Sequence, residues 1–538
     1  MINSYNKCPL KITPLIKKTL THELFHAYED HAKKKQLNYP ECRTSPRPGA
    51  KRRASTHCRA IKKHKLRKNL ISDDIIFQTA SLLHGRVNDN FKGYRVLDPY
   101  ELKNKEEFAA INFESFIYDS EYQCRRPSIY NYFAAHFNFH PFKNILCSKT
   151  NAIIVESENA KKVTLDLDRI YQFHYLEASK GKGVISGFGH SMLRVVTCAP
   201  WRQVGPDCLK DLDHHIVLSY RANTFNLNIS LFKGITGKYP AQLFALPFTQ
   251  IIKEYNVREL RDLYSYPLQL DKQERESFVD RVLESFWEYK GSYKFFSNNC
   301  ATDTYKLVAG IDLKLDNKLI NSRTPIGIFE DLINHGFINK IYTNTKNLGP
   351  LNIFKSDSKY FNIAYLQLFK TKLKKEYLLK QVETNPTFLN SITNELEANI
   401  LRDINIMHPS QLKSKYLKDI SALYIIQKRV YNILKEKAHL YSFKLKLIEY
   451  EKKTSKNNSE EEKLLASTYG IPSSNEVDSF SNEDIQAWLG DNTVELNSTD
   501  RKNIQKKYNL AYERIDTLTR IYKLINMVKM PLQTGESL

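Results

Sequence analysis

Glycine and turn-forming residues are spread unevenly along this 538-residue chain, and the unevenness limits what each part can fold into. From about residue 346 onward the chain is rich in Lys, Leu and Glu and has almost no Gly. With so few residues to interrupt it, such a segment favours long helices. We expect helices at about 358–382, 410–452 and 500–528, with polar breaks at 455–462 and 471–482. The tail is therefore predicted to form a helical hairpin or a small bundle.

The middle of the chain has a different pattern. Short runs rich in β-branched and aromatic residues alternate there with turn residues and a few helical patterns. These runs lie at 151–156, 215–220 and 224–231. The mixture predicts an α+β domain. We therefore expect three regions: residues 1–119, with two strong helix signals around a basic loop, the α+β domain at 120–345, and the helical tail at 346–538.

The chain is strongly basic, with a formal net charge of +22. Basic residues are densest between Arg43 and Lys68, where no Asp or Glu occurs. Such an excess favours nucleic acid, an anionic membrane surface or an acidic polymer as a partner and selects none of them. The stretch lacks the interleaved aromatic side chains that stack on bases. No nucleic-acid partner is therefore expected, and a solvated basic loop is the favoured interpretation.

Several sequence features concern the cell compartment. No uninterrupted apolar run reaches the length of about 18 residues that a transmembrane helix needs. The first ten residues also lack the apolar stretch of a secretory signal.

None of the eight cysteines forms a Cys-x-x-Cys pair, which argues against a zinc ribbon. Cys124 with Cys147, and Cys198 with Cys208, could each form a disulfide in an exported protein, and buried reduced thiols are the equal alternative.

An H-E-x-x-H motif lies near the start of the chain. Thr13 is a suitable N-cap and Pro14 suits the first helical position, so a helix is expected to run through the motif. Residues four apart share one face of a helix, and His22 and His26 could therefore direct imidazole nitrogens at one Zn²⁺. Glu23 would be placed to take a proton from water at such a site. An ordinary helix with a polar face is the alternative.

The sequence offers a third ligand for this zinc ion. Residues 105–116 have a strong helical pattern in which Glu107, Ile111 and Glu114 fall on one face. The segment resembles the second zinc-binding helix of gluzincin metallopeptidases, in which a Glu at the start of an E-F-x-A-like segment completes the metal site. The resemblance implies that Glu107 is the third ligand and that Glu114 is a partner of a ligating histidine. An exposed helical carboxylate is the alternative for Glu107.

A cysteine opens a second helical pattern in the middle region. Asn299, or Ser297 before it, can cap a helix whose first turn contains Cys300. Backbone N–H groups and the helix dipole at that position stabilise a thiolate and lower the pKa of a thiol. A buried structural cysteine is the alternative.

A histidine opens a strand-like run earlier in the same region. Gly187 and Gly189 precede His190 and allow close approach of the backbone, and residues 193–197 have a β-like pattern. This places the imidazole at the end of a strand, where it could deprotonate a thiol. A hydrogen-bonded structural histidine is the alternative.

These features together resemble the bacterial family named for the Lnb N-terminal periplasmic domain. The run F-G-H-S-M-L-R at 188–194 resembles the family's G-H-[ST]-x-L-R signature. Other segments that resemble the family are a C-R-x-P segment at 124–127, a glycine-rich turn at 233–240, a segment similar to R-D-L-W-E-Y-P-L at 261–268, an amphipathic helix at 272–289 and Asn-Cys at 299–300. The resemblance extends over roughly residues 120–345.

The order of His before Cys, with Asn-Cys opening a helix, is also similar to circularly permuted papain-like folds. The resemblance implies that Cys300 is a nucleophile and His190 its general base, working through a thioester. Asn299 would cap the helix or support an oxyanion. Arg261 and Asp262 would orient the substrate, and a structural ion pair is the alternative for them. The sequence identifies no third member of a catalytic triad.

Three functions are open on these grounds. The first is a thiol acyltransferase or hydrolase of the bacterial cell envelope that acts on a lipoprotein, lipid or peptide, as the resemblance to the named family implies. The second is a zinc metallopeptidase of gluzincin type, for which the later domain recruits the substrate. The third is a non-enzymatic envelope scaffold whose helical tail binds a partner. The resemblance implies a periplasmic or envelope location, with peripheral membrane contact.

Overall fold

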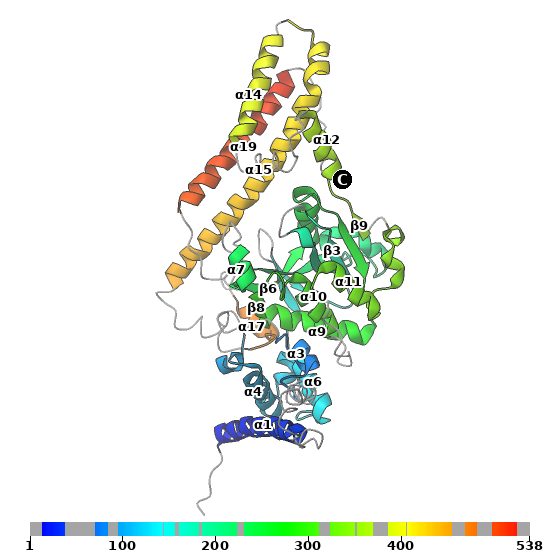
Figure 1. Cartoon of the computed structure of the whole chain (residues 1–538), viewed down its shortest axis with the longest axis vertical. Coiled ribbons are helices and arrows are strands. Elements are labelled where there is room, and N and C mark those ends of the chain that lie inside the picture. Colours follow the sequence, from blue (N-terminus) through cyan, green and yellow to red (C-terminus); the bar gives the residue numbers. More distant parts are fainter. Residues whose placement is uncertain are drawn as a thin grey trace, which may run out of the picture.

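A computed structural model describes residues 13–37, 70–83, 95–143, 145–156, 161–181, 186–222, 231–310, 323–349, 352–368, 386–404, 406–454, 469–480 and 498–524. These parts form three tiers along the longest axis of the molecule (Figure 1). Helix α1 (Pro14–Leu37) lies across one end, and a sheet with its covering helices forms the middle. A group of long helices forms the other end.

The middle tier is built on a mixed nine-stranded sheet. The strand order is β2-β1-β6-β5-β4-β3-β7-β9, and β8 pairs with β6 off this path. Only β1 and β6 pair in parallel, and the other pairs within the described sheet are antiparallel. The strands are β1 (Ala152–Val155), β2 (Lys161–Thr164), β3 (Ile170–Ala178), β4 (His190–Thr197), β5 (Ile216–Ala222), β6 (Tyr239–Pro247), β7 (Leu263–Pro267), β8 (Lys290–Tyr293) and β9 (Ile353–Phe354).

Two of the three predicted β-rich runs are confirmed as strands. The run at 151–156 contains β1, and the run at 215–220 contains most of β5. The third run, at 224–231, lies outside the described residues except for Leu231, which opens the short helix α7 (Leu231–Thr236). The α+β prediction therefore holds at the level of a mixed sheet covered by helices.

The two faces of the sheet bury different sets of side chains, because successive residues of a strand point to opposite sides. On one face, Tyr175 and Leu193 belong to the core that includes helices α9 (Lys272–Glu288), α10 (Cys300–Ala309) and α11 (Pro325–Asn334). On the other face, Met192 and Val217 pack with α8 (Phe248–Ile252) and the π-helical turn Lys253–Arg258. Strand β4 thus presents alternate residues to two separate cores. Short 3₁₀ turns complete this tier: η4 (Ser186–Phe188), η5 (Pro206–Lys210), η6 (Leu212–His214), η8 (Lys340–Thr343) and η9 (Thr345–Asn347).

The first tier is helical and has its own aromatic core. Its elements are α1, α3 (Ile75–Ala80), η3 (Pro99–Leu102), α4 (Lys105–Tyr118), α5 (Tyr122–Arg125) and α6 (Pro127–Phe137). Phe25, Phe77, Phe108, Phe116 and Phe133 are fully buried between these helices. Burial of so much aromatic surface gives a small helical unit enough apolar area to hold α1 in place. The two helices expected before residue 119 are confirmed as α1 and α4.

The third tier is helical, as predicted. It consists of α12 (Ser358–Leu368), α14 (Pro386–Asp403), α15 (Pro409–Thr454) and α19 (Ser498–Leu524). Leu423, Ile426 and Leu518 lie in the core that these helices share. Helices α15 and α19 confirm the two later predictions, and α12 covers the first part of the helix expected at 358–382. Helix α14 was not predicted, and the expected break at 455–462 lies outside the described residues.

One segment of the tail returns to the middle tier. Residues 469–480 contain α17 (Ser474–Ser479), and Ile471 and Val477 are buried in the core on the α9 side of the sheet. The carboxylate of Glu476 pairs with the guanidinium groups of Arg95 and Arg125. The break expected at 471–482 does lie between the long helices α15 and α19. Its described part is nevertheless anchored to the middle tier, because two apolar side chains among polar neighbours are buried.

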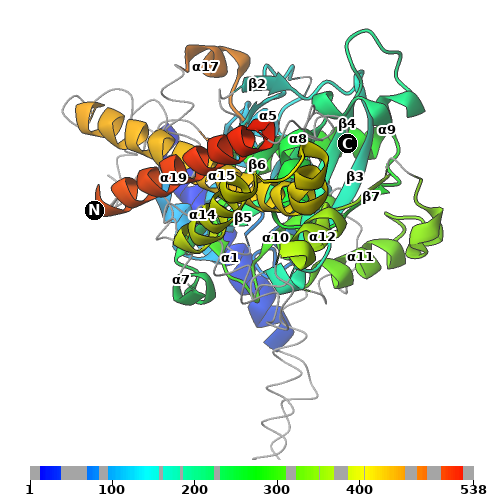
Figure 2. The ribbon, with the colours of Figure 1, turned by 90° about the horizontal axis from the view of Figure 1, so that it is seen from above.

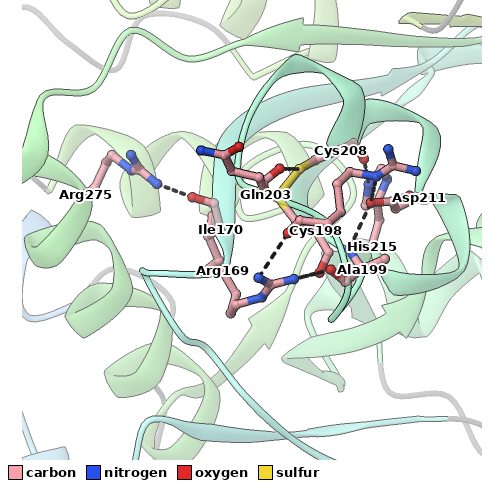
Figure 3. The surroundings of a disulfide bond; sticks show 10 residues. Arg169, Ile170, Cys198, Ala199, Gln203, Cys208, Asp211, His215 and Arg275 are labelled. Carbon is pink, nitrogen blue, oxygen red and sulfur yellow. Dashed lines mark hydrogen bonds and ion pairs between the residues drawn. A yellow bond between two sulfur atoms is a disulfide. The ribbon is translucent and has the colours of Figure 1, made fainter.

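Both candidate cysteine pairs are disulfides. The bond between Cys124 and Cys147 ties α5 to the segment that leads into β1. The bond between Cys198 and Cys208 closes a loop after β4, and Arg169 donates to the backbone carbonyl of Cys198 at 3.1 Å (Figure 3). Disulfides persist in oxidising compartments, so this pairing agrees with an exported protein.

Candidate functional site

Packing against the aromatic core determines which side of α1 faces α4. The helix begins as predicted, with the N–H of Ile16 donating to Oγ1 of Thr13 at 3.3 Å. Phe25 is buried, and the carboxylate of Glu29 accepts hydrogen bonds of 2.9 Å from both the backbone N–H and the hydroxyl of Ser72. These contacts turn one side of α1 toward α4, and the two histidines of the H-E-x-x-H motif lie on that side.

His22, His26 and Glu107 converge between α1 and α4. Nε2 of His22 lies 3.1 Å from Nε2 of His26 and 3.1 Å from Oε2 of Glu107, and Nε2 of His26 lies 3.2 Å from the same oxygen. Three donors bound at 2.0–2.2 Å to one tetrahedral ion stand roughly 3.3–3.6 Å apart. The observed separations are within a few tenths of an ångström of that geometry. The three side chains therefore form a group that could hold one metal ion.

Glu114 supports this cluster from the same face of α4. Its Oε1 lies 2.7 Å from Nδ1 of His22. A proton on Nδ1 that is donated to this carboxylate leaves the lone pair of Nε2 directed at the other two donors. Burial raises the pKa of Glu114, although the contact with His22 opposes the shift. Burial acts the same way on Glu107, but hydrogen bonds from His26 and His22 outweigh it and lower the pKa of that carboxyl.

Glu23 follows His22 in α1 and is exposed to solvent. It is not one of the three converging donors. Its role as proton acceptor stays a prediction of the motif.

Two residues beside the cluster were missed by sequence reasoning. Tyr100 lies in the 3₁₀ turn η3, with its ring centroid 6.5 Å from that of His22. Nζ of Lys103 donates to the hydroxyl of Tyr100 at 2.7 Å and lies 3.8 Å from Oε1 of Glu107. Both side chains are partly exposed. A phenol and an ammonium group beside these three donors could stabilise negative charge on a molecule bound there.

The second candidate site lies in the middle tier, at the start of α10. Cys300 is the free cysteine among the described residues and is buried. Asn299 caps the helix as predicted, with Oδ1 accepting from the backbone N–H groups of Ala301 and Thr302. Nδ2 of Asn299 donates to two backbone carbonyls, so both of its hydrogens have partners and its observed role is that of a cap.

The predicted lowering of the thiol pKa does not occur. Burial raises the pKa of the Cys300 thiol, although hydrogen bonds from the backbone N–H of Ser191, the hydroxyl of Tyr293 and the backbone N–H of Ala301 oppose it. Desolvation of the thiolate outweighs the stabilisation by the helix terminus and by these three donors. Burial thus favours the protonated form of the Cys300 thiol.

His190 lies at the same end of the sheet but faces away from α10. It pairs with Ala178 in the β3–β4 register, and Ala178 belongs to the core on the α8 side. Its Nε2 lies 2.9 Å from Oγ of Ser219, and its ring stacks on Tyr255 with centroids 5.9 Å apart. Burial, with the nearby positive charges of two arginines, holds the pKa of His190 well below its usual range. The described contacts thus bring Cys300 to the backbone of Ser191 and direct the imidazole of His190 to Ser219.

Glu177, on strand β3, faces the side of the sheet that α10 covers, which is also the side of Cys300. Glu177 pairs with Ser191 in the β3–β4 register. The hydroxyl of Tyr175, two residues earlier on the same strand, forms a hydrogen bond of 2.7 Å with Oγ of Ser191. Burial raises the pKa of Glu177 to about 7. A carboxyl group with this pKa exchanges protons near neutrality. Glu177 is therefore a titratable group on the side of the sheet that α10 covers, and the sequence did not indicate it.

Arg261 and Asp262, the predicted substrate-binding residues, make contacts within the fold. Arg261 is buried. Its guanidinium donates to the backbone carbonyl of Ala178 at 3.2 Å and pairs with the carboxylate of Glu259 at 2.6 Å. Oδ1 of Asp262 accepts from the backbone N–H of Ser356 at 2.7 Å. These contacts join β7 to the neighbouring strand and to the start of the tail.

Comparison with known proteins gives two family matches. Residues 156–335 match the model of the Lnb N-terminal periplasmic domain. Residues 13–145 match a family described as a domain of unknown function (DUF7844). No curated protein and no solved structure matches the chain.

The predicted resemblance is thus confirmed for the part of the chain that holds the thiol site. The Lnb N-terminal periplasmic domain includes both Cys300 and His190, whereas the cluster of His22, His26 and Glu107 lies in the other matched segment. A family of periplasmic domains indicates a protein of the bacterial envelope, and the two disulfides agree. Within the part of the chain that the structure describes, no helix combines the length and apolarity needed to cross a membrane.

Proposed function

We propose that this chain is a zinc-dependent peptidase of the bacterial envelope, with its metal centre at His22, His26 and Glu107. One observation carries the proposal: two imidazole nitrogens and one carboxylate oxygen, from two helices, stand 3.1–3.2 Å from each other. Two histidines and a glutamate are a donor set of catalytic zinc, and three protein ligands leave a fourth position open. The residues present therefore fit this metal.

Zinc held by these residues would polarise the carbonyl of a peptide bond and lower the pKa of a water molecule at the open position. The carboxylate of Glu23 would accept the proton of the attacking water and return it to the leaving nitrogen. Tyr100 and Lys103 would donate hydrogen bonds to the negative charge that develops on the carbonyl oxygen. The Lnb N-terminal periplasmic domain would bind the protein that is cut.

Hydrolysis of a fluorescently labelled, unfolded protein tests this function. We expect 1,10-phenanthroline to abolish hydrolysis by the full chain and added Zn²⁺ to restore it. Alkylation of Cys300 should leave the rate unchanged. His22→Ala should remove the activity, whereas His31→Ala, at an exposed position of the same helix, should retain it. Hydrolysis that resists chelation and is lost in Cys300→Ser would contradict the proposal, and a zinc-loaded chain without any hydrolysis would favour a scaffold.

Glu114→Gln tests the support of the metal centre. Loss of the carboxylate that holds Nδ1 of His22 should weaken zinc affinity by about 10–100-fold, because such partners orient the ligand and raise its basicity. Competition with a fluorescent zinc chelator measures the change. Glu106→Gln, on the same helix but outside the cluster, is the matched control and should keep the affinity of the unaltered chain. Equal affinities for both variants would show that Glu114 has no such role.

A second candidate function is acyl transfer or hydrolysis at Cys300, with a permuted papain-like arrangement. Its support is the position of the sulfur at the start of α10, where three hydrogen-bond donors surround it. In this chemistry the thiolate attacks an ester carbonyl, a C–S bond forms as the C–O bond breaks, and the base returns its proton to the leaving alkoxide. His190 is the base that the family resemblance implies, and Glu177 is the base that shares the face of Cys300.

Acid quenching of a reaction with p-nitrophenyl hexanoate, followed by peptide mass spectrometry, tests this second function. We expect an acyl adduct on Cys300 that is absent from Cys300→Ser. A larger rate loss in His190→Ala than in Glu177→Gln identifies His190 as the base, and the reverse order identifies Glu177. Without substrate, alkylation of Cys300 by iodoacetamide should be slow at pH 6 and rise as the pH increases, because burial raises its pKa. A chain that never forms the adduct lacks this activity.

A further inference from the structure

The link between β8 and α10 brings a tyrosine hydroxyl to the sulfur of Cys300. Strand β8 ends at Tyr293, and the chain turns back at once, with the backbone N–H of Lys294 donating to the carbonyl of Asn298 at 2.8 Å. The side-chain amide of Asn298 also donates to the carbonyl of Ser292 at 2.9 Å and holds the turn closed. Helix α10 begins two residues later. The turn therefore places Tyr293 beside the first turn of that helix.

The surroundings of Tyr293 keep its side chain in this position. Helix α10 contacts strands β4 and β5 and lies near the middle of the molecule when it is seen from above (Figure 2). Tyr293 is buried there, and its ring lies edge-on to that of Phe295, with centroids 5.9 Å apart. Its hydroxyl is therefore held beside α10 and away from solvent.

Two contacts with Cys300 give the Tyr293 hydroxyl a direction. The backbone N–H of Cys300 donates to the hydroxyl oxygen, and the hydroxyl donates its own hydrogen to the sulfur. Backbone N–H groups of Ser191 and Ala301 also donate to the sulfur. A hydrogen bond is stronger when its acceptor is charged, so these donors favour the thiolate. Of the three, Tyr293 supplies a side chain that a substitution can alter.

Asn299 does not compete for this role. The sequence indicated it as a support for an oxyanion, but Nδ2 of Asn299 donates to the backbone carbonyls of Phe295 and Arg323 at 3.0 Å each. An amide whose hydrogens are bonded to the protein in this way has to break a bond before it can donate to a substrate. The hydrogen of the Tyr293 hydroxyl, in contrast, already lies on the reacting atom.

We propose that Tyr293 is a catalytic residue of the thiol site, which donates its hydrogen bond first to the thiolate of Cys300 and then to the oxyanion. This inference rests on the second candidate function. When the sulfur attacks an ester carbonyl, a C–S bond forms and an electron pair of the C=O bond moves to the oxygen. Negative charge passes to an atom on the same carbon, within reach of a donor that touched the sulfur. The C=O bond then re-forms as the C–O bond breaks, and the leaving alkoxide takes the proton that the base removed from the thiol.

The pH dependence of alkylation tests the contact with the thiolate. Iodoacetamide reacts with the thiolate rather than the thiol, and peptide mass spectrometry of the full chain follows Cys300 by itself. Tyr293→Phe should react about tenfold more slowly near pH 7, because loss of a donor to a charged group raises the pKa of the thiol. Where the pH is high enough to ionise the thiol in both chains, the two rates should converge. Faster reaction at every pH would show that the ring only packs against the thiol and would count against the proposal.

Tyr289→Phe is the matched control. The hydroxyl of Tyr289 is also buried beside α10, but it donates to Asp303 at 3.4 Å and accepts from Asn298 at 3.2 Å rather than contacting the sulfur. This variant should keep the alkylation profile of the unaltered chain. A tyrosine fluorinated next to its hydroxyl, placed at position 293, is a stronger donor of nearly the same size and should shift the reaction to lower pH. Unchanged profiles in both chains altered at position 293 would overturn the proposal.

Acylation by p-nitrophenyl hexanoate tests the contact with the oxyanion. At a pH where Cys300 is ionised to the same extent in both chains, Tyr293→Phe should form the acyl adduct about 10²–10³-fold more slowly. Equal rates under that condition would overturn the role of Tyr293 at the oxyanion. If the unaltered chain forms no adduct at all, the second candidate function and the oxyanion role fail together, whereas the alkylation profile still decides whether Tyr293 stabilises the thiolate.

Discussion

Glu23→Gln should keep its zinc and lose about 10²–10⁴-fold in the rate of peptide hydrolysis, the range that a positioned general base contributes. Glu23 is not one of the three converging donors and is exposed beside them, so its amide leaves the metal ligands in place. The amide has no charge with which to accept a proton from water. Zinc content by mass spectrometry and hydrolysis of the labelled protein, measured on the same sample, separate these two effects.

The control for this variant is Glu106→Gln, which makes the same chemical change next to a ligand but outside the cluster. It should hydrolyse the substrate at the rate of the unaltered chain. A Glu23→Gln chain that remains fully active with zinc bound would assign the proton transfer to another group. A chain that loses zinc together with activity would show that Glu23 belongs to the metal site itself.

The largest effect on stability should come from Arg126→Met. The guanidinium of Arg126 is fully buried and makes two hydrogen bonds of 2.9 Å to the carboxylate of Glu101, an ion pair of 3.1 Å with Glu288 and a bond of 2.6 Å to Asn112. These partners come from η3, α4 and α9, so one side chain connects the first tier to the helix that covers the sheet. Its pKa is raised in spite of burial, because the two carboxylates favour the cation.

Replacing Arg126 would leave the buried carboxyl groups of Glu101 and Glu288 without the positive charge of its guanidinium. Loss of one partner from a buried ionic cluster costs about 3–5 kcal/mol, because the remaining charge stays desolvated. Denaturant unfolding followed by circular dichroism should show this decrease in the free energy of unfolding. Lys210→Ala, which breaks an exposed pair with Asp207, should change stability very little. Equal midpoints for the two variants would contradict a supporting role for the buried cluster.

The cluster of His22, His26 and Glu107 could be predicted because each of its parts is local in sequence. The cap at Thr13, the spacing of His22 and His26 and the spacing of Glu107 and Glu114 depend only on the period of a helix. The contact between α1 and α4 does not depend on the helical period, and it was predicted through the resemblance to gluzincins. It holds because Phe25, on the same side of α1 as the histidines, enters the aromatic core beside α4.

The thiol site could be predicted only in part. The sequence indicated that Cys300 opens a helix and that His190 opens a strand, and both are confirmed. Which side of the sheet each side chain faces depends on strand register, and a shift of one residue exchanges the two faces. Because His190 pairs with Ala178, its imidazole turns to the α8 side. Glu177 was missed since nothing in its own segment shows that it lies opposite Ser191.

Tyr100 and Lys103 were missed for another reason. They lie in a 3₁₀ turn and the short link that follows it, where no periodic pattern marks a functional side. The buried segment around Ile471 was missed in a similar way, because two apolar residues in a polar stretch give no regular signal. Such features appear only when segments far apart in the chain come together.

The most direct test of the account is the amount and coordination of zinc in the purified chain. We expect one zinc ion per chain, with X-ray absorption that shows nitrogen and oxygen ligands at about 2.0–2.2 Å and no sulfur. His22→Ala and Glu107→Gln should each lose the ion, whereas His31→Ala should retain it. A chain that binds no zinc at micromolar concentrations, or that binds it equally in all of these variants, would contradict a metal centre at His22, His26 and Glu107.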